Sequence, residues 1–343
     1  MSILRNILPS CEYKQEFNND REVIEDIIKP IIMTATFFGL LPISINFSKI
    51  KQIYVPVPKS IYLNSFRCVT FILLNIVFLI FHIYLLYASA ESSNFANLPK
   101  RINYIFENLN FLIVCVTAYV SGFLNRYIYL EILNKIICAW TKMPPSDNGQ
   151  KILKKIAVQC YIILLGIMLV LLFLIYFNSN QVNIQWKLVL GMSLNMPQTI
   201  QLVYHGFYTV LVILLAAVLC RITEHFKSPT QSASIIEVRP KQRHLSLVEM
   251  KSLYIEVYEI KLIIEQAFKA PLTYSLLQSF HSLIAESYFI FYGILYSKDI
   301  PTYIIYACAE WILCQVIKVY SLSYSGNLLK NAVRIHSRPY LLN

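Results

Sequence analysis

Long apolar runs without charge are the dominant pattern along the chain. Three of them contain no charged side chain at all, and these are residues 68–90, 156–186 and 188–220. Two later runs contain one acidic residue each, Glu286 in 270–297 and Glu310 in 300–317. A hydrocarbon core about 30 Å thick needs about 20 apolar residues in helical form. Each run is therefore long enough, or nearly so, to cross a bilayer.

These runs do not alternate between apolar and polar residues, so they favour helices over the strands of a membrane barrel. The pattern predicts an all-α fold, a polytopic transmembrane helical bundle. The six helices that we expect to cross the membrane are 68–90, 105–128, 156–178, 195–222, 270–297 and 303–320. Gly39 and Pro42 divide a weaker apolar segment, 31–48, which we expect to be re-entrant or interfacial rather than a seventh crossing.

Composition strengthens the membrane assignment and decides the orientation. Only 14% of the residues are charged and 57% are hydrophobic, whereas soluble domains carry about 25% charged residues. The net charge of +11 suggests nucleic acid at first, but its distribution does not. With six crossings, all but four of the 30 Lys and Arg lie on one side, Arg221 and Lys318 among them; the exceptions are Lys100, Arg101, Lys187 and Lys298. The positive-inside rule then places both termini in the cytoplasm.

The long segment 223–269 is expected to combine a flexible linker with an amphipathic helix. Its second half carries apolar residues at spacings of three and four, a helical stripe that continues into the fifth span; they are Met250, Leu253, Val257, Ile260, Ile264 and Phe268. We therefore expect three parts: a cytoplasmic N-terminal segment at 1–30, one transmembrane domain at 31–320 with a cytoplasmic loop and helix extension at 223–269, and a cytoplasmic C-terminal segment at 321–343.

Two groups of polar and aromatic residues inside the predicted helices are candidate ligand-binding sites. The first, on the fourth helix, consists of Gln198, Gln201, Tyr204, His205 and Tyr208, of which the last four can share one face. The second spans the fifth and sixth helices and consists of Glu286, Tyr288, Tyr292, Tyr303, Tyr306 and Glu310. Polar groups among aromatic walls suit a small-molecule pocket, and ionisable residues within a membrane are costly enough to suggest function. Hydrogen bonding between helices explains both groups equally well.

Enzymatic chemistry is not indicated. The six histidines show no metal-ligand spacing, and neither a glycine-rich phosphate loop nor a nucleophile elbow occurs. We expect no enzyme activity, no cofactor, no metal and no nucleic-acid partner.

Several stretches together resemble the insect gustatory receptors of the insect chemoreceptor superfamily. Near the start, Ile28, Pro30 and the sequence Phe38-Gly39-Leu40-Leu41-Pro42 resemble the opening motif of that family. Residues 213–226 are similar to the end of its fourth helix, and 247–290 to its long fifth helix. Trp311, Lys318-Val319-Tyr320 and the stretch 321–335 resemble its sixth helix and the segment that follows.

The resemblance implies a taste receptor of the plasma membrane that is a subunit of a tastant-gated, non-selective cation channel. It implies assembly as a homo- or hetero-tetramer with other chemoreceptor subunits in the lipid bilayer. The family's seventh helix, which carries a TYhhhhhQF motif beside the ion pathway, has no counterpart after Val333, so we expect a chain that lacks its pore helix and does not conduct alone. A G-protein-coupled receptor and a secondary transporter are the alternatives, although the chain has neither a DRY-like triplet nor paired broken helices in repeated halves.

Overall fold

The three-dimensional structure is a computed structural model. It describes residues 18–42, 45–48, 53–56, 58–88, 98–144, 147–180, 189, 191–231, 245–296 and 302–337.

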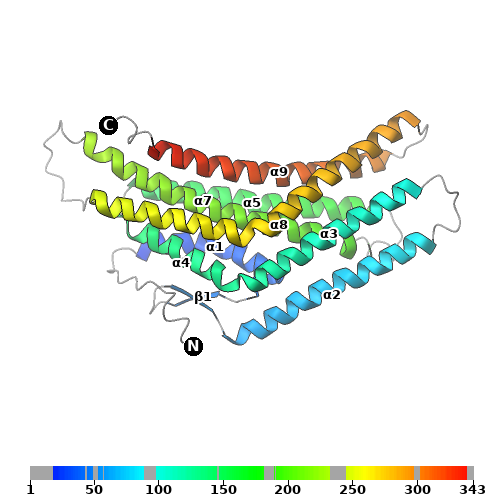
Figure 1. Cartoon of the computed structure of the whole chain (residues 1–343), viewed down its shortest axis with the longest axis horizontal. Helices are drawn as coiled ribbons and strands as arrows, with labels where there is room; N and C mark the ends of the chain where they lie inside the picture. The colour runs from blue at the N-terminus through cyan, green and yellow to red at the C-terminus, as the bar shows by residue number, and fades with distance from the viewer. Residues whose placement is uncertain are drawn as a thin grey trace.

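Long helices lying roughly along one direction make up most of the molecule (Figure 1). In chain order the helices are α1 (Asn18–Phe37), α2 (Pro58–Ala88), α3 (Leu98–Leu124), α4 (Arg126–Thr141), α5 (Asp147–Asn180), the π-helical turn η5 (Gly191–Asn195), α7 (Met196–Gln231), α8 (Leu247–Tyr296) and α9 (Thr302–Ser337). The predicted helical bundle is confirmed. Among the described residues, four helical stretches are long and apolar enough to span a membrane, namely Tyr62–Tyr84, Ile105–Leu124, Asn148–Tyr176 and Gly191–His225.

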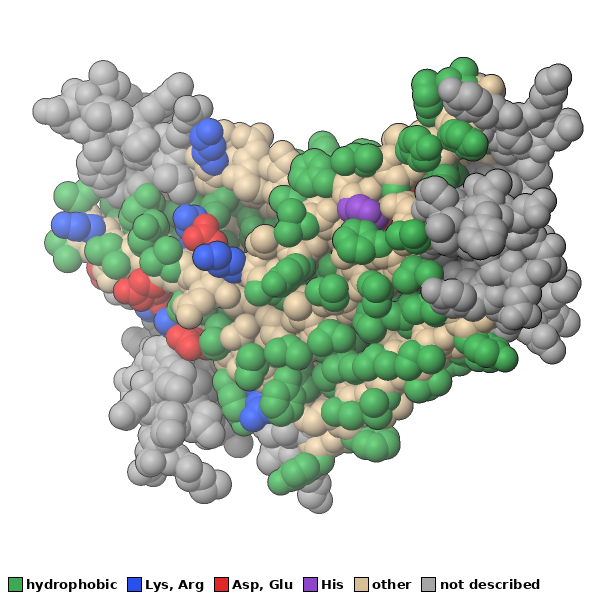
Figure 2. Space-filling model, turned by 45° about the vertical axis from the view of Figure 1, so that its right-hand side comes forward, with side chains coloured by type: hydrophobic (Ala, Val, Ile, Leu, Met, Phe, Trp, Pro, Cys, Tyr) green, Lys and Arg blue, Asp and Glu red, His purple; other side chains and the backbone are tan. Residues whose placement is uncertain are grey.

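The bundle has a buried centre and an apolar outer surface. Helix α7 lies at the centre. Of the residues in its most apolar stretch 94% are buried, against 17% in that of α5 and 22% in that of α2. The outward faces of α2 and α5 carry exposed Leu, Ile, Val and Phe side chains, which lipid can solvate. In Figure 2 the charged side chains gather toward one end of the visible face, while apolar side chains cover much of the rest. This surface is that of a membrane protein with one charged end.

The segment 31–48 does not form one element. Residues 31–37 are the last turns of α1, which begins upstream at Asn18 and packs against α5 and α7. Gly39 then turns the chain with a positive φ of 74°, a conformation that glycine adopts without steric cost. The Tyr119 hydroxyl donates to the Phe38 carbonyl at 2.9 Å. The motif that resembled the family opening is therefore a tight turn fixed against α3.

A β-hairpin that the sequence did not predict follows this turn. Strands β1 (Ile45–Ser48) and β2 (Ile53–Pro56) pair antiparallel. The Asn134 side chain on α4 both accepts from the Tyr54 N–H at 2.7 Å and donates to the Tyr54 carbonyl at 3.1 Å. One amide side chain thus fixes the hairpin to α4.

Helix α8 is continuous over 50 residues. It begins with a capping box, in which the Ser246 N–H donates to the Glu249 carboxylate at 2.8 Å and the Glu249 N–H donates to the Ser246 hydroxyl at 3.2 Å. The amphipathic stripe predicted between Met250 and Phe268 is buried at all six positions. The predicted cytoplasmic extension and the fifth span are therefore one helix.

Helices α3 and α4 meet at Asn125, where the sequence predicted one uninterrupted helix to residue 128. Pro271 lies inside α8 and lacks an N–H, so the carbonyl four residues earlier, on Ala267, loses its helical partner. The Ser121 hydroxyl donates to that carbonyl at 2.8 Å, and the Asn125 side chain donates to it at 3.2 Å. Figure 1 shows α8 bending at mid-length beside the corner between α3 and α4.

Candidate functional site

A buried ammonium group lies at the meeting point of four helices. Lys318 on α9 has 1% of its surface exposed. Its Nζ donates to the side-chain oxygens of Gln201 at 2.7 Å, Gln278 at 2.9 Å and Gln198 at 3.3 Å. The first and last of these glutamines belong to α7, and Gln278 belongs to α8. All three N–H groups of the ammonium therefore have amide acceptors.

A hydrogen-bonded relay connects this ammonium to a carboxylate on α3. The Gln278 amide nitrogen donates to the Ser282 hydroxyl at 2.8 Å, and that hydroxyl donates to the Glu107 carboxylate. Glu107 is 5% exposed, and its negative charge attracts Lys318. Because an unpaired charge inside a membrane protein is costly, an acidic and a basic group in the same cluster offset one another.

Helical periodicity on each element brings these side chains together. On α7, Gln198, Gln201 and His205 follow one another at spacings of three and four, which places them on one face. On α8, Ser275, Gln278 and Ser282 do the same. The faces meet directly, since His205 Nε2 lies 2.8 Å from the Ser275 hydroxyl. We call the group formed by Glu107, Gln198, Gln201, His205, Ser275, Gln278, Ser282 and Lys318 the polar core.

A second buried cluster is built from tyrosines next to the Pro271 bend. The hydroxyls of Tyr129 and Tyr204 lie 3.3 Å apart, and each is 3.4 Å from the Ser121 hydroxyl. The Phe268 ring packs against both tyrosines, with centroid distances of 5.2 and 5.1 Å, and against Tyr208 at 5.4 Å. This tyrosine cluster joins α3, α4, α7 and α8 through aromatic contact and hydroxyl hydrogen bonds.

The family follows from comparison with known proteins. The sequence profile described as "7tm Chemosensory receptor" matches residues 28–335. The chain belongs to the 7tm chemosensory receptor family. A search among curated proteins found no match.

The fold of this chemosensory receptor is similar to that of the insect olfactory receptor OR5 from Machilis hrabei. The TM-score is 0.68 with 11% sequence identity, and the alignment covers 92% of this chain and 83% of the other. Family and fold together make the chain a membrane-embedded, multi-pass receptor and not an enzyme. In the described part of the chain no three His, Cys, Asp or Glu residues are grouped so that they could hold a metal ion.

The first predicted group on α7 is divided between the two clusters. Gln198, Gln201 and His205 belong to the polar core, and they are 0%, 1% and 3% exposed. Tyr204 and Tyr208 face the tyrosine cluster instead. Both parts are inside the receptor, and the structure adds partners from three other helices.

The second predicted group lies largely on the outside of the bundle. Tyr288 and Tyr292 on α8 are 59% and 50% exposed and stack on one another at 5.9 Å, and Tyr306 on α9 is 58% exposed. Glu286 is buried, whereas Glu310 is half-buried. Tyr303 lies in α9, but its side chain is outside the described set. The expected antiparallel packing of α8 and α9 is present.

Two basic residues assigned to the cytoplasmic side are buried inside the protein. One is Lys318, in the polar core. The other is Arg221 on α7, 1% exposed, which donates to the Pro144 carbonyl at 2.7 Å and lies 4.4 Å over the Trp140 ring. Arg221 thus binds the carbonyl end of α4, where a cation is favourable. The sequence did not predict this burial, because the positive-inside rule counts residues by sequence position alone.

The residues that sequence reasoning missed in the polar core are Glu107, Ser275, Gln278, Ser282 and Lys318. A signal was present for two of them, because Glu107 and Lys318 fall inside the predicted spans 105–128 and 303–320. An opposite charge in each of two spans is the pattern expected of an intramembrane pair. Nothing in the sequence pairs α8 with these charges, since which faces meet depends on helix packing.

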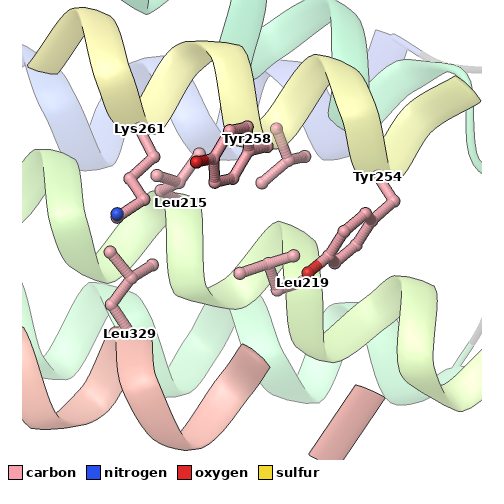
Figure 3. A pocket seen from close by; sticks show the side chains of 7 residues that line it. Leu215, Leu219, Tyr254, Tyr258, Lys261 and Leu329 are labelled. Carbon is pink, nitrogen blue, oxygen red and sulfur yellow. The ribbon is translucent and has the colours of Figure 1, made fainter. Parts of the chain in front are cut away.

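A shallow groove lies apart from the polar core, between α7, α8 and α9 (Figure 3). It is lined by Leu215, Leu219, Tyr254, Val257, Tyr258, Lys261 and Leu329. Lys261 is already paired with Glu265 at 3.0 Å. The remaining walls are mainly apolar, so the groove lacks the convergent polar groups that orient a ligand.

Proposed function

We propose that this chain is a gustatory receptor, a subunit of a tastant-gated, non-selective cation channel in the plasma membrane. It works as a homo- or hetero-tetramer with other chemoreceptor subunits and has its N-terminus in the cytoplasm. The observation that carries the proposal is the polar core inside a chain of the chemosensory receptor family. A costly group of buried polar side chains on four helices is suited to sensing a small molecule.

The ligand reaches the receptor from outside and binds at the polar core and the adjoining tyrosine cluster. Gln198, Gln201 and His205 supply hydrogen bonds, while Tyr204 and Tyr208 supply aromatic wall. Since these side chains belong to helices that also contact α3, α8 and α9, a ligand that separates them shifts the helices against one another. The second predicted group, which includes Glu286 and Glu310, is a second, weaker candidate site for the ligand.

Recording ionic current tests this function. The chain is expressed with a full-length chemoreceptor subunit, and a panel of tastants is applied while membrane current is measured. We expect an evoked cation current that persists when G-protein signalling is blocked. Replacement Gln201→Leu is expected to shift the half-maximal concentration at least about ten-fold, the effect of about one lost hydrogen bond.

The exposed residue Tyr161 on α5 gives the control for that recording. Tyr161→Phe removes one hydroxyl from the outside of the bundle and is expected to leave the response unchanged. A current that disappears when G proteins are inhibited would favour a coupled receptor. No tastant-dependent current from any subunit combination, at normal surface expression, contradicts the proposal.

A further inference from the structure

The polar core has hydrogen-bond donors left over after its internal bonds are counted. The side-chain nitrogen of Gln201, whose oxygen binds Lys318, makes no hydrogen bond within the described residues. In the same part of the chain, Gln315, one turn before Lys318 on α9, has an unpaired nitrogen and an unpaired oxygen, and His205 has an unpaired Nδ1. Gln201, Gln315 and His205 are at most 3% exposed.

Such groups are costly unless an acceptor reaches them. A buried donor without a partner lowers the stability of the folded state, and the bilayer core has no bulk water to supply the bond. Among the described residues, the unpaired donors nearest the cation are the amide N–H groups of Gln201 and of Gln315, one turn along α9. An apolar ligand leaves them unpaired, and a cationic ligand is repelled by Lys318.

We propose that the polar core binds the carboxylate group of a small anionic ligand, with Lys318 as its counter-ion. This proposal rests on the proposed function, because it names the chemical class of ligand that the receptor detects. The ligand's two oxygens accept from the Lys318 ammonium and from the amide of Gln201. Neutral analogues that lack the charge do not replace it.

The glutamines allow the polar core to change between the empty and the occupied state. In the empty state their side-chain oxygens face Lys318. The torsion that turns a glutamine amide is soft and roughly two-fold, so a half-turn replaces the oxygen by the N–H₂ group. When a carboxylate takes the ammonium, the amides of Gln198 and Gln201 turn over and donate to the ligand, while the Gln278 nitrogen keeps its bond to Ser282.

Glu107 is an internal competitor in this arrangement. Its carboxylate is connected to the ammonium through Ser282 and Gln278, and it supplies the negative charge that the ligand brings. Removing the Glu107 charge is therefore expected to strengthen ligand binding, whereas removing the Lys318 charge abolishes it. If the pair had only a structural role, the two replacements would not have opposite effects on ligand binding.

Thermal unfolding of the full chain in lipid nanodiscs, titrated with butanoate or with butanamide, tests the proposal. We expect butanoate to raise the unfolding midpoint and butanamide to leave it unchanged. Glu107→Gln is expected to lower the apparent Kd for butanoate about ten-fold, the equivalent of one charge-assisted hydrogen bond. Lys318→Met is expected to lose the butanoate effect, and the exposed-lysine control Lys330→Met to keep it.

Should Lys318→Met fail to fold, Lys318→Arg and Glu107→Gln carry the test, because both keep a cation in the polar core. Equal stabilisation by butanamide, or weaker butanoate binding in Glu107→Gln, overturns the carboxylate site. Tastant-evoked current without any butanoate effect also overturns it and leaves the receptor function standing. Butanoate binding without any tastant-evoked current supports the carboxylate site and contradicts the receptor function.

Discussion

At the scale of single residues, the interior is specified by a few polar contacts rather than by apolar burial alone. Lys318 and Arg221 are among the largest fully buried side chains. Lys318 donates to glutamine oxygens of two other helices, and Arg221 donates to the Pro144 carbonyl after α4. Sequence reasoning identified Gln198, Gln201 and His205 as candidate binding residues but did not predict that the two cations are buried. Loop counting cannot detect a buried cation, because a helix end is assigned by hydropathy while burial depends on which neighbours pack there.

The charge of Lys318 is expected to be replaceable only when that of Glu107 is removed with it. Lys318→Met leaves the Glu107 charge buried without its counter-charge and is expected to cost about 3–5 kcal/mol of folding free energy. The double replacement Lys318→Met with Glu107→Gln removes both charges and is expected to recover most of that loss. The unfolding midpoints of the four proteins in the cycle measure the coupling. A double variant as unstable as the sum of the single ones refutes the pairing.

Gly122 on α3 is expected to accept no side chain. A Cβ atom added there would lie 2.2 Å from the Leu40 carbonyl oxygen, in the turn that follows α1. Gly122→Ala is therefore expected to lower stability by about 1–3 kcal/mol, the usual cost of overpacking. Gly166→Ala on α5 meets nothing within 4 Å and is the control. The amount of receptor that survives heating, quantified by size-exclusion chromatography, distinguishes the two variants. Equal survival of both variants contradicts the close approach of Gly122 to Leu40.

At the scale of elements, hydropathy located the long helices, while their breaks depended on contacts remote in sequence. The amphipathic stripe from Met250 to Phe268 correctly predicted that α8 begins well before its apolar span. The corner at Asn125 was missed because no proline or long polar run interrupts residues 105–128. That corner exists where the carbonyl of Ala267, freed by Pro271, needs donors from α3. The β-hairpin was missed for a similar reason, since its fixing residue, Asn134, is on α4.

The bond between Ser121 and the Ala267 carbonyl is expected to matter only while Pro271 is present. Ser121→Ala removes one of two donors to a buried carbonyl and is expected to cost about 1–3 kcal/mol. In a Pro271→Ala background the new backbone N–H can reach the same carbonyl, so the cost of Ser121→Ala is expected to fall. Thr117→Ala, which removes only a bond to Val114 within α3, serves as the control. An unchanged Ser121→Ala cost in both backgrounds excludes this coupling.

At the scale of the whole molecule, the charged end and the apolar outer surface define how the receptor lies in the membrane. Apolar side chains on α2 and α5 point away from the protein interior, so their environment is lipid. Ion pairs such as Lys142 with Glu256, at 2.6 Å between α4 and α8, lie in the half that includes the start of α8. The sequence predicted this polarity well, because it depends on summed composition. The excess of Lys and Arg on one side of the membrane stays large when the buried residues Arg221 and Lys318 are left out of the count.

The direct test of this arrangement is the side of the membrane on which each connecting segment lies. A glycosylation sequon is inserted into segment 179–194, or instead into segment 228–243, and sugar attachment is read from the mobility shift of the protein made in cells. We expect sugar at the first position only, and none at the native sequon Asn46-Phe47-Ser48. Sugar in segment 228–243 or at Asn46 contradicts the cytoplasmic location of the charged end, and with it the receptor orientation on which ligand entry from outside depends.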